Sequence, residues 1–269
     1  MRRSPLRQAI GAALCLSALG VVRDAGAQAP LAGGLPGRWF EVNGLAQSVT
    51  NGYGDWRGAY ARVVQPLAHD TWYVDALALD AFRERGAQVG VTHRHDWTGR
   101  VFHMLGVNVG SGAPIMPRAR VDGALGLRLG SARAVQVTGG LSYVKSVTEL
   151  SDVAGIASIA WYAPRAVMIE IGGRYNVSRP GDITSHRLSS TVVWTPSPRR
   201  SFSVRAIGGS EGWQIVRTGT TLTRFHSNDF SLSWREKVTT SLALTAQGDW
   251  YRNPYYTRSG VTLGVARYW

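Results

Sequence analysis

The sequence predicts an all-β fold, a transmembrane antiparallel up-and-down β-barrel of about 14 strands, with about 12 as the alternative. Three observations predict it. The chain ends in an aromatic residue that closes an alternating segment, many earlier segments alternate in the same way, and no apolar run long enough for a spanning helix follows the first 27 residues. We therefore expect lipid to surround the folded chain.

The start of the chain has the layout of a cleaved signal peptide. Three arginines precede an uncharged apolar run over 9–22, and Ala25-Gly26-Ala27 has the small-x-small form of a cleavage site. We expect residues 1–27 to be removed, 28–38 to form a short periplasmic segment and 39–269 to form the barrel. This organisation predicts export to the outer membrane of a Gram-negative bacterium.

Cysteine and charge exclude several classes of function. The single cysteine, Cys15, lies in the expected signal peptide, so the mature chain has neither a disulfide framework nor a thiolate metal site. Formal net charge is +13 for the whole chain, but the basic residues are scattered, which disfavours nucleic-acid binding. Only Lys145 and Lys237 are lysines. The arginine excess reflects either a GC-rich genome or contact with lipopolysaccharide phosphates or an anionic glycan.

The first strand-like segments have mixed faces. They cover residues 39–49, 56–65, 71–82, 87–96 and 100–110, and the inward residues cannot all be assigned from their patterns. The segment 118–130 is the clearest, because Val121, Leu125 and Leu127 share one face while Asp122 and Arg128 share the other. Its length suits a tilted membrane strand better than a soluble sandwich strand.

The later segments repeat this pattern to the end of the chain. Apolar and polar residues alternate over 166–177, 184–195, 202–206, 229–235 and 241–250. In the last segment Val261, Leu263, Val265 and Trp269 share one parity. A terminal aromatic on such a strand is typical of outer-membrane barrels, so we expect Val265 and Trp269 to form an assembly signal that the barrel-assembly machinery recognises.

The connections between segments alternate in length. The expected turns at 66–70, 97–99, 131–133, 163–165, 196–199 and 236–237 are short, whereas 110–117, 178–183 and 209–222 are longer. Outer-membrane barrels have short periplasmic turns and longer outer loops, so the pattern predicts that both termini are periplasmic. Tryptophans near the segment ends predict girdles at the two membrane interfaces, at positions 39, 56, 72, 97, 161, 194, 234, 250 and 269.

Three stretches resemble the YaiO family of outer-membrane β-barrel proteins. They are 51–58, which reads NGYGDWRG, then 179–187, which reads RPGDITSHR, and the ending from Asn253-Pro254-Tyr255-Tyr256 through Tyr268-Trp269. The resemblance extends over essentially the whole mature chain. It implies an outer-membrane location and, through some members, an association with surface polysaccharide, but no catalytic residues.

Histidines are the remaining candidates for chemistry. His93 and His95 share one strand face, as a metal site requires, but the neighbouring Asp96 points the other way and no nearby carboxylate completes a set. Ser185-His186 and His226-Ser227 are sequence neighbours, and adjacent strand residues point apart, so neither forms a nucleophile–base pair. We expect no metal, no other cofactor and no enzymatic activity.

The functional prediction rests on charged residues whose side chains are expected to point into the barrel. We expect eight residues to line the lumen, namely Asp122, Arg128, Glu170, Arg174, Arg187, Arg205, Arg235 and Asp249. They form either a basic constriction for anionic solutes or an ion-paired plug. The leading hypothesis is therefore a channel, or an accessory that transports or displays cell-surface carbohydrate. A plugged structural or lipopolysaccharide-binding barrel and an outer-membrane hydrolase remain alternatives. The expected partners are outer-membrane lipid, lipopolysaccharide and surface polysaccharide.

Overall fold

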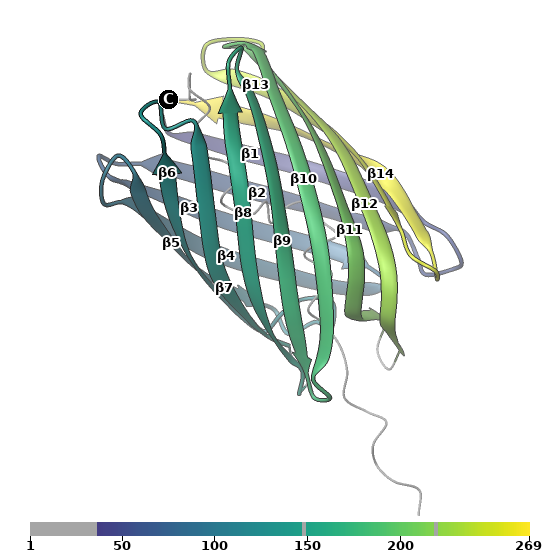
Figure 1. Cartoon of the computed structure of the whole chain (residues 1–269). Helices are drawn as coiled ribbons and strands as arrows, with labels where there is room; N and C mark the ends of the chain where they lie inside the picture. Colours follow the sequence, from purple (N-terminus) through teal and green to yellow (C-terminus); the bar gives the residue numbers. More distant parts are fainter. Residues whose placement is uncertain (1–36, 147–148, 218–219) are drawn as a thin grey trace, which may run out of the picture.

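The chain forms one closed barrel of fourteen antiparallel strands in the computed structural model, which describes residues 37–146, 149–217 and 220–269 (Figure 1). Each strand pairs with its neighbour in sequence, and β1 pairs with β14 to close the sheet. The predicted topology and the count of fourteen are confirmed. Residues 1–27, the expected signal peptide, lie outside the described residues.

The strand bounds are β1 (Trp39–Val49), β2 (Trp56–Pro66), β3 (Asp70–Ala81), β4 (Glu84–Asp96), β5 (Val101–Gly110), β6 (Ala119–Leu129), β7 (Val135–Lys145), β8 (Ser151–Ala163), β9 (Val167–Arg179), β10 (Ile183–Ser197), β11 (Arg200–Arg217), β12 (Thr220–Lys237), β13 (Leu242–Arg252) and β14 (Thr257–Tyr268). Within the described part of the chain, no helix is long and apolar enough to cross a membrane.

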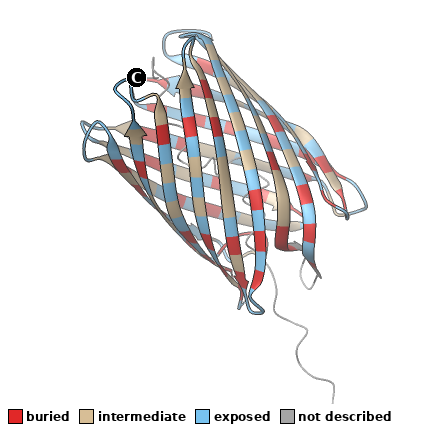
Figure 2. Ribbon diagram, viewed as in Figure 1, coloured by how far each residue is buried: buried red, intermediate tan, exposed pale blue. Residues whose placement is uncertain are grey.

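Burial alternates residue by residue along the wall (Figure 2). In β1 every second side chain from Trp39 to Val49 is buried and those between are exposed. Successive side chains of a strand point to opposite faces, so one set fills the barrel and the other covers its outside. Leu125, Leu141 and Leu188 lie in the outer set and expose 65%, 68% and 68% of their surfaces. Such a surface requires an apolar solvent.

The barrel has two distinct ends. The end where β1 begins and β14 finishes is called the terminal end here, and the other is called the far end. The turns of the far end include the two-residue connection Phe82-Arg83 and the three residues 180–182, so its loops are not uniformly longer. The predicted alternation between short and long connections therefore holds only in part.

The expected outer loop at 209–222 is wrong. β11 and β12 continue through most of it and are 18 residues long each, with pairing that extends to Arg217 and Thr220. The alternation of short and long connections suggested a loop in this stretch, but Glu211 and Gln214 are buried on the inner side of the hairpin. Gly209 permits this path because its φ is +147° and a Cβ would lie 2.2 Å from the His186 carbonyl oxygen.

Tryptophans form a girdle chiefly at the terminal end. Trp72, Trp97, Trp161, Trp194 and Trp269 expose between 41% and 63% of their surfaces there. Amphipathic aromatic rings favour a membrane–water interface, so this end of the outer wall lies at one.

Two tryptophans that were expected in the girdle lie inside the barrel. Trp39 and Trp56 are 8% and 0% exposed, because both fall on the inward parity of their strands. Trp39 packs with Tyr268 and Val64 in an apolar cluster at the terminal end. Trp56 belongs to a larger cluster at the far end. Position near a strand end therefore does not by itself place a tryptophan in the membrane interface.

Candidate functional site

The interior of the barrel holds a cavity of about 360 Å³, lined by residues from every strand between β2 and β13. On the strands from β4 to β12 the inward positions carry many small or hydroxyl-bearing residues, which leave space beside the sheet. They include Gly90, Gly106, Gly140, Gly172, Thr92, Thr138, Ser158, Ser189, Thr191, Ser203, Ser231 and Ser233. We call this side of the interior the hollow wall.

Charged residues of both signs line the cavity. Its lining contains six arginines, at positions 62, 120, 174, 187, 205 and 235, against four carboxylates, at positions 75, 122, 152 and 170. Arg120 and Asp122 lie two apart on β6 and form an ion pair with an Nε–Oδ2 distance of 2.7 Å. The lining residues alone therefore carry two more positive than negative charges. Arg187 and Arg235 are, however, paired with Glu211 and Glu41, two acids that lie outside the lining.

Larger side chains fill the opposite side, formed by β1–β3, β13 and β14, which we call the filled wall. Arg62 Nε lies 2.6 Å from Asp75 Oδ1, and Tyr60 donates a hydrogen bond of 2.7 Å to the same oxygen. Arg235 reaches from β12 to pair with Glu41 of β1. The pairing of buried charges offsets their loss of hydration. We call this network of ion pairs and hydrogen bonds between strands the bonded scaffold.

A second charged network lies toward the terminal end. Asp96 accepts hydrogen bonds from Arg94 at 3.1 Å and from Arg128 at 2.9 Å. The Arg94 guanidinium also stacks over the Phe102 ring, with 4.0 Å from its Cζ to the ring centroid. A carboxylate shared by two arginines leaves net positive charge beside the lumen.

The long β11–β12 hairpin contributes a buried acid at the far end. Glu211 accepts hydrogen bonds from Ser227 and, at 3.2 Å, from Tyr251. Arg187 Nη1 lies 3.6 Å from the same carboxylate, and both side chains are almost fully buried. Polar contacts thereby join the two strands of the hairpin and tie it to β10 and β13, which explains why its inner face keeps strand structure.

An apolar cluster occupies the interior of the far end. It joins Leu45, Val49, Trp56, Leu77, Leu79, Ala81, Phe82, Ile115, Met116, Leu222, Phe225, Tyr251 and Tyr256. Most of these come from the filled wall, but Ile115 and Met116 belong to the loop between β5 and β6 and are 0% and 1% exposed. This loop therefore folds against the interior instead of extending away from it.

The eight charged residues named from the sequence all lie on inward faces. Six line the cavity, namely Asp122, Glu170, Arg174, Arg187, Arg205 and Arg235. Arg128 is paired with Asp96 at 2.9 Å, and Asp249 accepts a hydrogen bond of 2.6 Å from Gln247, which lines the cavity. Among these eight, Arg174 of β9 and Arg187 of β10 are direct cross-strand partners, whereas Arg235 pairs with Glu41 of the filled wall.

Sequence reasoning missed much of the bonded scaffold. Glu41, Arg62, Asp75 and Asp96 lie in the first five strands, where both faces mix polar and apolar residues. Glu211 fell in the expected outer loop. The alternation of Glu41 and Asn43 with the apolar Phe40 and Val42 could have identified Glu41 as inward, but the other acids become evident only once cross-strand partners are known.

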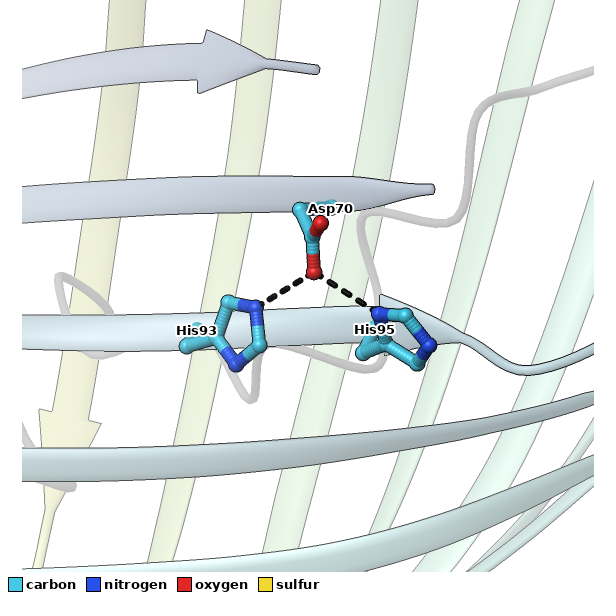
Figure 3. A group of neighbouring side chains, drawn as sticks. All are labelled: Asp70, His93 and His95. Atoms are coloured by element: carbon cyan, nitrogen blue, oxygen red, sulfur yellow. Dashed lines mark hydrogen bonds and ion pairs between the residues drawn. The ribbon is translucent and has the colours of Figure 1, made fainter. Parts of the chain in front are cut away.

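A histidine group lies on the outer face of the same strands (Figure 3). His93 Nε2 and His95 Nδ1 lie 2.7 Å and 2.8 Å from Asp70 Oδ1. The expectation that no carboxylate completes a set with these histidines is therefore wrong. Asp96 does face inward, but Asp70 of β3 pairs directly with His95 in the sheet register, which the sequence alone does not reveal.

The serine–histidine neighbours do not form a hydrolytic triad. His186 contacts Ser210, with 3.2 Å between Nδ1 and Oγ, whereas Ser227 donates to Glu211. Among the described residues, no carboxylate accepts a hydrogen bond from His186, so no third group orients this pair.

A model of the YaiO membrane β-barrel domain matches residues 39–212. The chain belongs to the YaiO family. The match begins with β1 and ends within β11, so it includes the stretches 51–58 and 179–187 on which the resemblance was seen, while the ending from Asn253 lies beyond it. Among curated proteins, none matches this chain in sequence.

Solved structures with the same fold are outer-membrane proteins. The YaiO-family barrel is similar to the COG4313 outer membrane channel from Pseudomonas putida F1, with a TM-score of 0.54, 12% identity and coverage of 87% of this chain and 96% of that one. Omp33 from Acinetobacter baumannii gives a TM-score of 0.51, 13% identity and coverage of 87% and 99%.

A bacterial polysaccharide outer membrane secretin gives a TM-score of 0.53, 9% identity and coverage of 86% of this chain and 97% of that one. At these identities the likeness establishes the fold alone. Together with the family match, it makes this chain an outer-membrane β-barrel with a porin-like or channel-like fold.

Proposed function

We propose that this barrel is an outer-membrane channel, or an accessory channel, for anionic solutes or carbohydrate of the cell surface. The observation that carries the proposal is the cavity of about 360 Å³ inside the barrel, with its hydroxyl-rich hollow wall and six arginines against four carboxylates. A purely structural barrel has no need to leave this space beside small residues on nine consecutive strands.

The size and lining of the cavity suit a sugar. Ligand pockets typically measure about 300–1,000 Å³, so the space is large enough for a small saccharide. Serine and threonine hydroxyls, together with Gln88 and Asn108 amides, can exchange hydrogen bonds with sugar hydroxyls. Arginine guanidinium groups bind a carboxylate or phosphate through two parallel hydrogen bonds, so the arginines of the lining favour acidic sugars over neutral ones.

We assign the gate to the far-end apolar cluster. Ile115 and Met116 are carried by a loop, so a change in that loop would open the interior without disturbing strand pairing. We further propose that the terminal end of the barrel faces the periplasm and that the far end faces the outside of the cell. Val265 and Trp269, which expose 48% and 60% of their surfaces at the terminal end, serve in recognition by the assembly machinery.

Single-channel recording in planar bilayers tests the proposal. We expect ion-conducting steps with anion preference for the purified mature barrel. Replacing Arg174 and Arg205 by glutamate moves the reversal potential in a salt gradient toward the cation value, because both residues line the cavity. Arg252→Glu is the matched control, because this arginine is exposed at the end of β13 and outside the cavity lining.

A second variant tests the proposal even if the channel is closed at rest. The variant with Ile115→Ala and Met116→Ala removes the loop's buried side chains, and its conductance should exceed that of the wild type. Absence of current steps in both the wild type and this variant, when each is correctly folded, contradicts a channel. Addition of an acidic oligosaccharide should block the current more strongly than the neutral sugar of equal length.

One observation favours the lipopolysaccharide-binding alternative. Exposed arginines occur around the far end on several strands, including Arg57, Arg85, Arg179 and Arg252. With the far end facing outside, guanidinium groups at this end of the barrel would contact the phosphates of lipopolysaccharide. Retention of lipopolysaccharide through purification, and its loss when Arg57 and Arg252 become glutamine, would support this contact; equal retention by that variant contradicts it.

A further inference from the structure

We propose that Asp70, His93 and His95 form a binding site for a divalent transition-metal ion on the outer face of the barrel. All three residues lie near the terminal end, where β3 begins and β4 finishes. The site is separate from the lumen, so it neither depends on the channel function nor shares residues with the cavity lining.

The sheet register brings the three residues together. Asp70 is the direct cross-strand partner of His95, and Trp72 is the partner of His93, so the two histidines flank the carboxylate from one neighbouring strand. His93 and His95 are two residues apart and share a face. Residues at sequence positions more than twenty apart thus meet because of antiparallel pairing between β3 and β4.

The distances suit one small ion. One ligand atom from each side chain lies within 4.8 Å of the other two, and both imidazole nitrogens already approach the same carboxylate oxygen (Figure 3). An ion bound at about 2.0–2.2 Å from each ligand atom requires those atoms to lie within about twice that distance of one another. Two imidazoles and one carboxylate are a donor set that suits Zn²⁺, Cu²⁺ or Ni²⁺ better than Ca²⁺ or Mg²⁺.

Aromatic side chains hold the histidines in place. The Trp72 ring lies 4.4 Å from the His93 ring, and the Trp97 ring lies 4.9 Å from the His95 ring, each measured between centroids. The side chains of Asp70, His93 and His95 are 35%, 24% and 29% exposed. The site is therefore oriented by its neighbours while an ion can reach it from the aqueous side of the interface.

His103 lies beside the site but is not one of its ligands. Its ring centroid is 5.7 Å from those of both His93 and His95. The Trp97 indole N–H donates a hydrogen bond of 2.8 Å to His103 Nδ1. An indole nitrogen only donates, so Nδ1 is the acceptor and, in the neutral ring, Nε2 carries the proton. That tautomer offers no free lone pair to a metal, and the ion therefore keeps open positions for water or a lipid phosphate.

Metal binding to the full-length mature barrel in detergent, prepared without a histidine tag, tests the site. Titration with Zn²⁺ is followed by calorimetry, and Co²⁺ is used as a spectroscopic probe of coordination. We expect one ion per barrel, with binding that weakens at acid pH because protons compete for the imidazoles. Asp70→Asn, His93→Ala and His95→Ala should each weaken binding by at least about tenfold, a lower limit set by losses seen even for outer residues of metal sites.

Two controls separate this site from incidental histidine binding. His186→Ala, at the far end, should leave affinity and stoichiometry unchanged, and His103→Ala should retain the one-ion stoichiometry and the Co²⁺ spectrum of three protein ligands. Equal affinity of the wild type and the Asp70→Asn variant would falsify the proposal, as would Zn²⁺ binding that survives in the His93→Ala, His95→Ala double variant. Single-channel current of the zinc-loaded and zinc-free barrels reports separately on the lumen, so failure of either proposal leaves the other measurable.

Discussion

The two sides of the barrel interior differ in what their inward positions carry, although both belong to one continuous sheet. The filled wall holds bonded pairs such as Arg62 with Asp75, together with the aromatic rings of Trp39 and Tyr268. The hollow wall carries Gly140, Ser189 and other small residues at equivalent positions. Period-two alternation is the same in both, so side-chain volume, and not strand geometry, decides where the lumen is open.

The largest expected effect lies in the filled wall. Arg62→Ala leaves the Asp75 carboxylate without its main partner, and loss of one member of a buried ion pair costs about 3–5 kcal/mol. We expect the free energy of unfolding, measured by urea titration in lipid vesicles, to fall by this order. The Asp75→Ala variant and the double variant complete a cycle in which the losses are not additive. Additive losses would show that the two side chains do not stabilise the wall as a pair.

Replacing one small inward residue by leucine in each wall compares the two walls directly. Ala243 of β13 is 0% exposed, so Ala243→Leu overpacks the filled wall and should cost about 1–3 kcal/mol of unfolding free energy. Ser189→Leu adds its side chain to the cavity, where space exists, and should change stability by less than about 0.5 kcal/mol. The same Ser189 variant should reduce single-channel conductance. Similar costs in both variants would remove the distinction between the walls.

The smallest expected loss of stability from a truncated side chain concerns the hydroxyl group that ties β13 to the β11–β12 hairpin. Tyr251→Phe removes a donor to Glu211 and an acceptor for Asn253, both at 3.2 Å, which should cost about 1–2 kcal/mol. Tyr175→Phe is the matched control, since Tyr175 exposes 56% of its surface outside the barrel. The urea midpoints of the two variants provide the measurement, and an equal shift would show that the buried hydroxyl adds no stability.

Alternation in sequence was sufficient to predict which face a residue occupies in the later strands. The segment around Asp122 and Arg128 is an example, because its apolar and polar sets separate cleanly. Alternation does not give the register between strands. The site at Asp70 depends on which residue of β4 lies opposite it, and the ion pair between Glu41 and Arg235 depends on closure of the barrel.

Two predictions, the loop at 209–222 and the placement of Trp56 in the girdle, were wrong for the same physical reason. Glycine and polar residues around 209–214 usually favour turns, yet here the polar groups are satisfied inside a hairpin by Ser227, Tyr251 and Tyr256. Likewise, Trp56 sits near a strand end but on the inward parity, where packing against Phe82 and Arg258 outweighs its preference for the interface. Long-range packing decided both cases, and a single sequence does not display it.

The seam between β1 and β14 joins eleven residue pairs, from Trp39 with Tyr268 to Val49 with Arg258. Every other neighbouring pair of strands is local in sequence and can form as a hairpin. This seam cannot form until the last strand has arrived, so a chain that is cut short keeps an unpaired edge on β1. In hydrocarbon such an edge is costly, so a stable barrel in the membrane requires the last strand to be present and paired with the first.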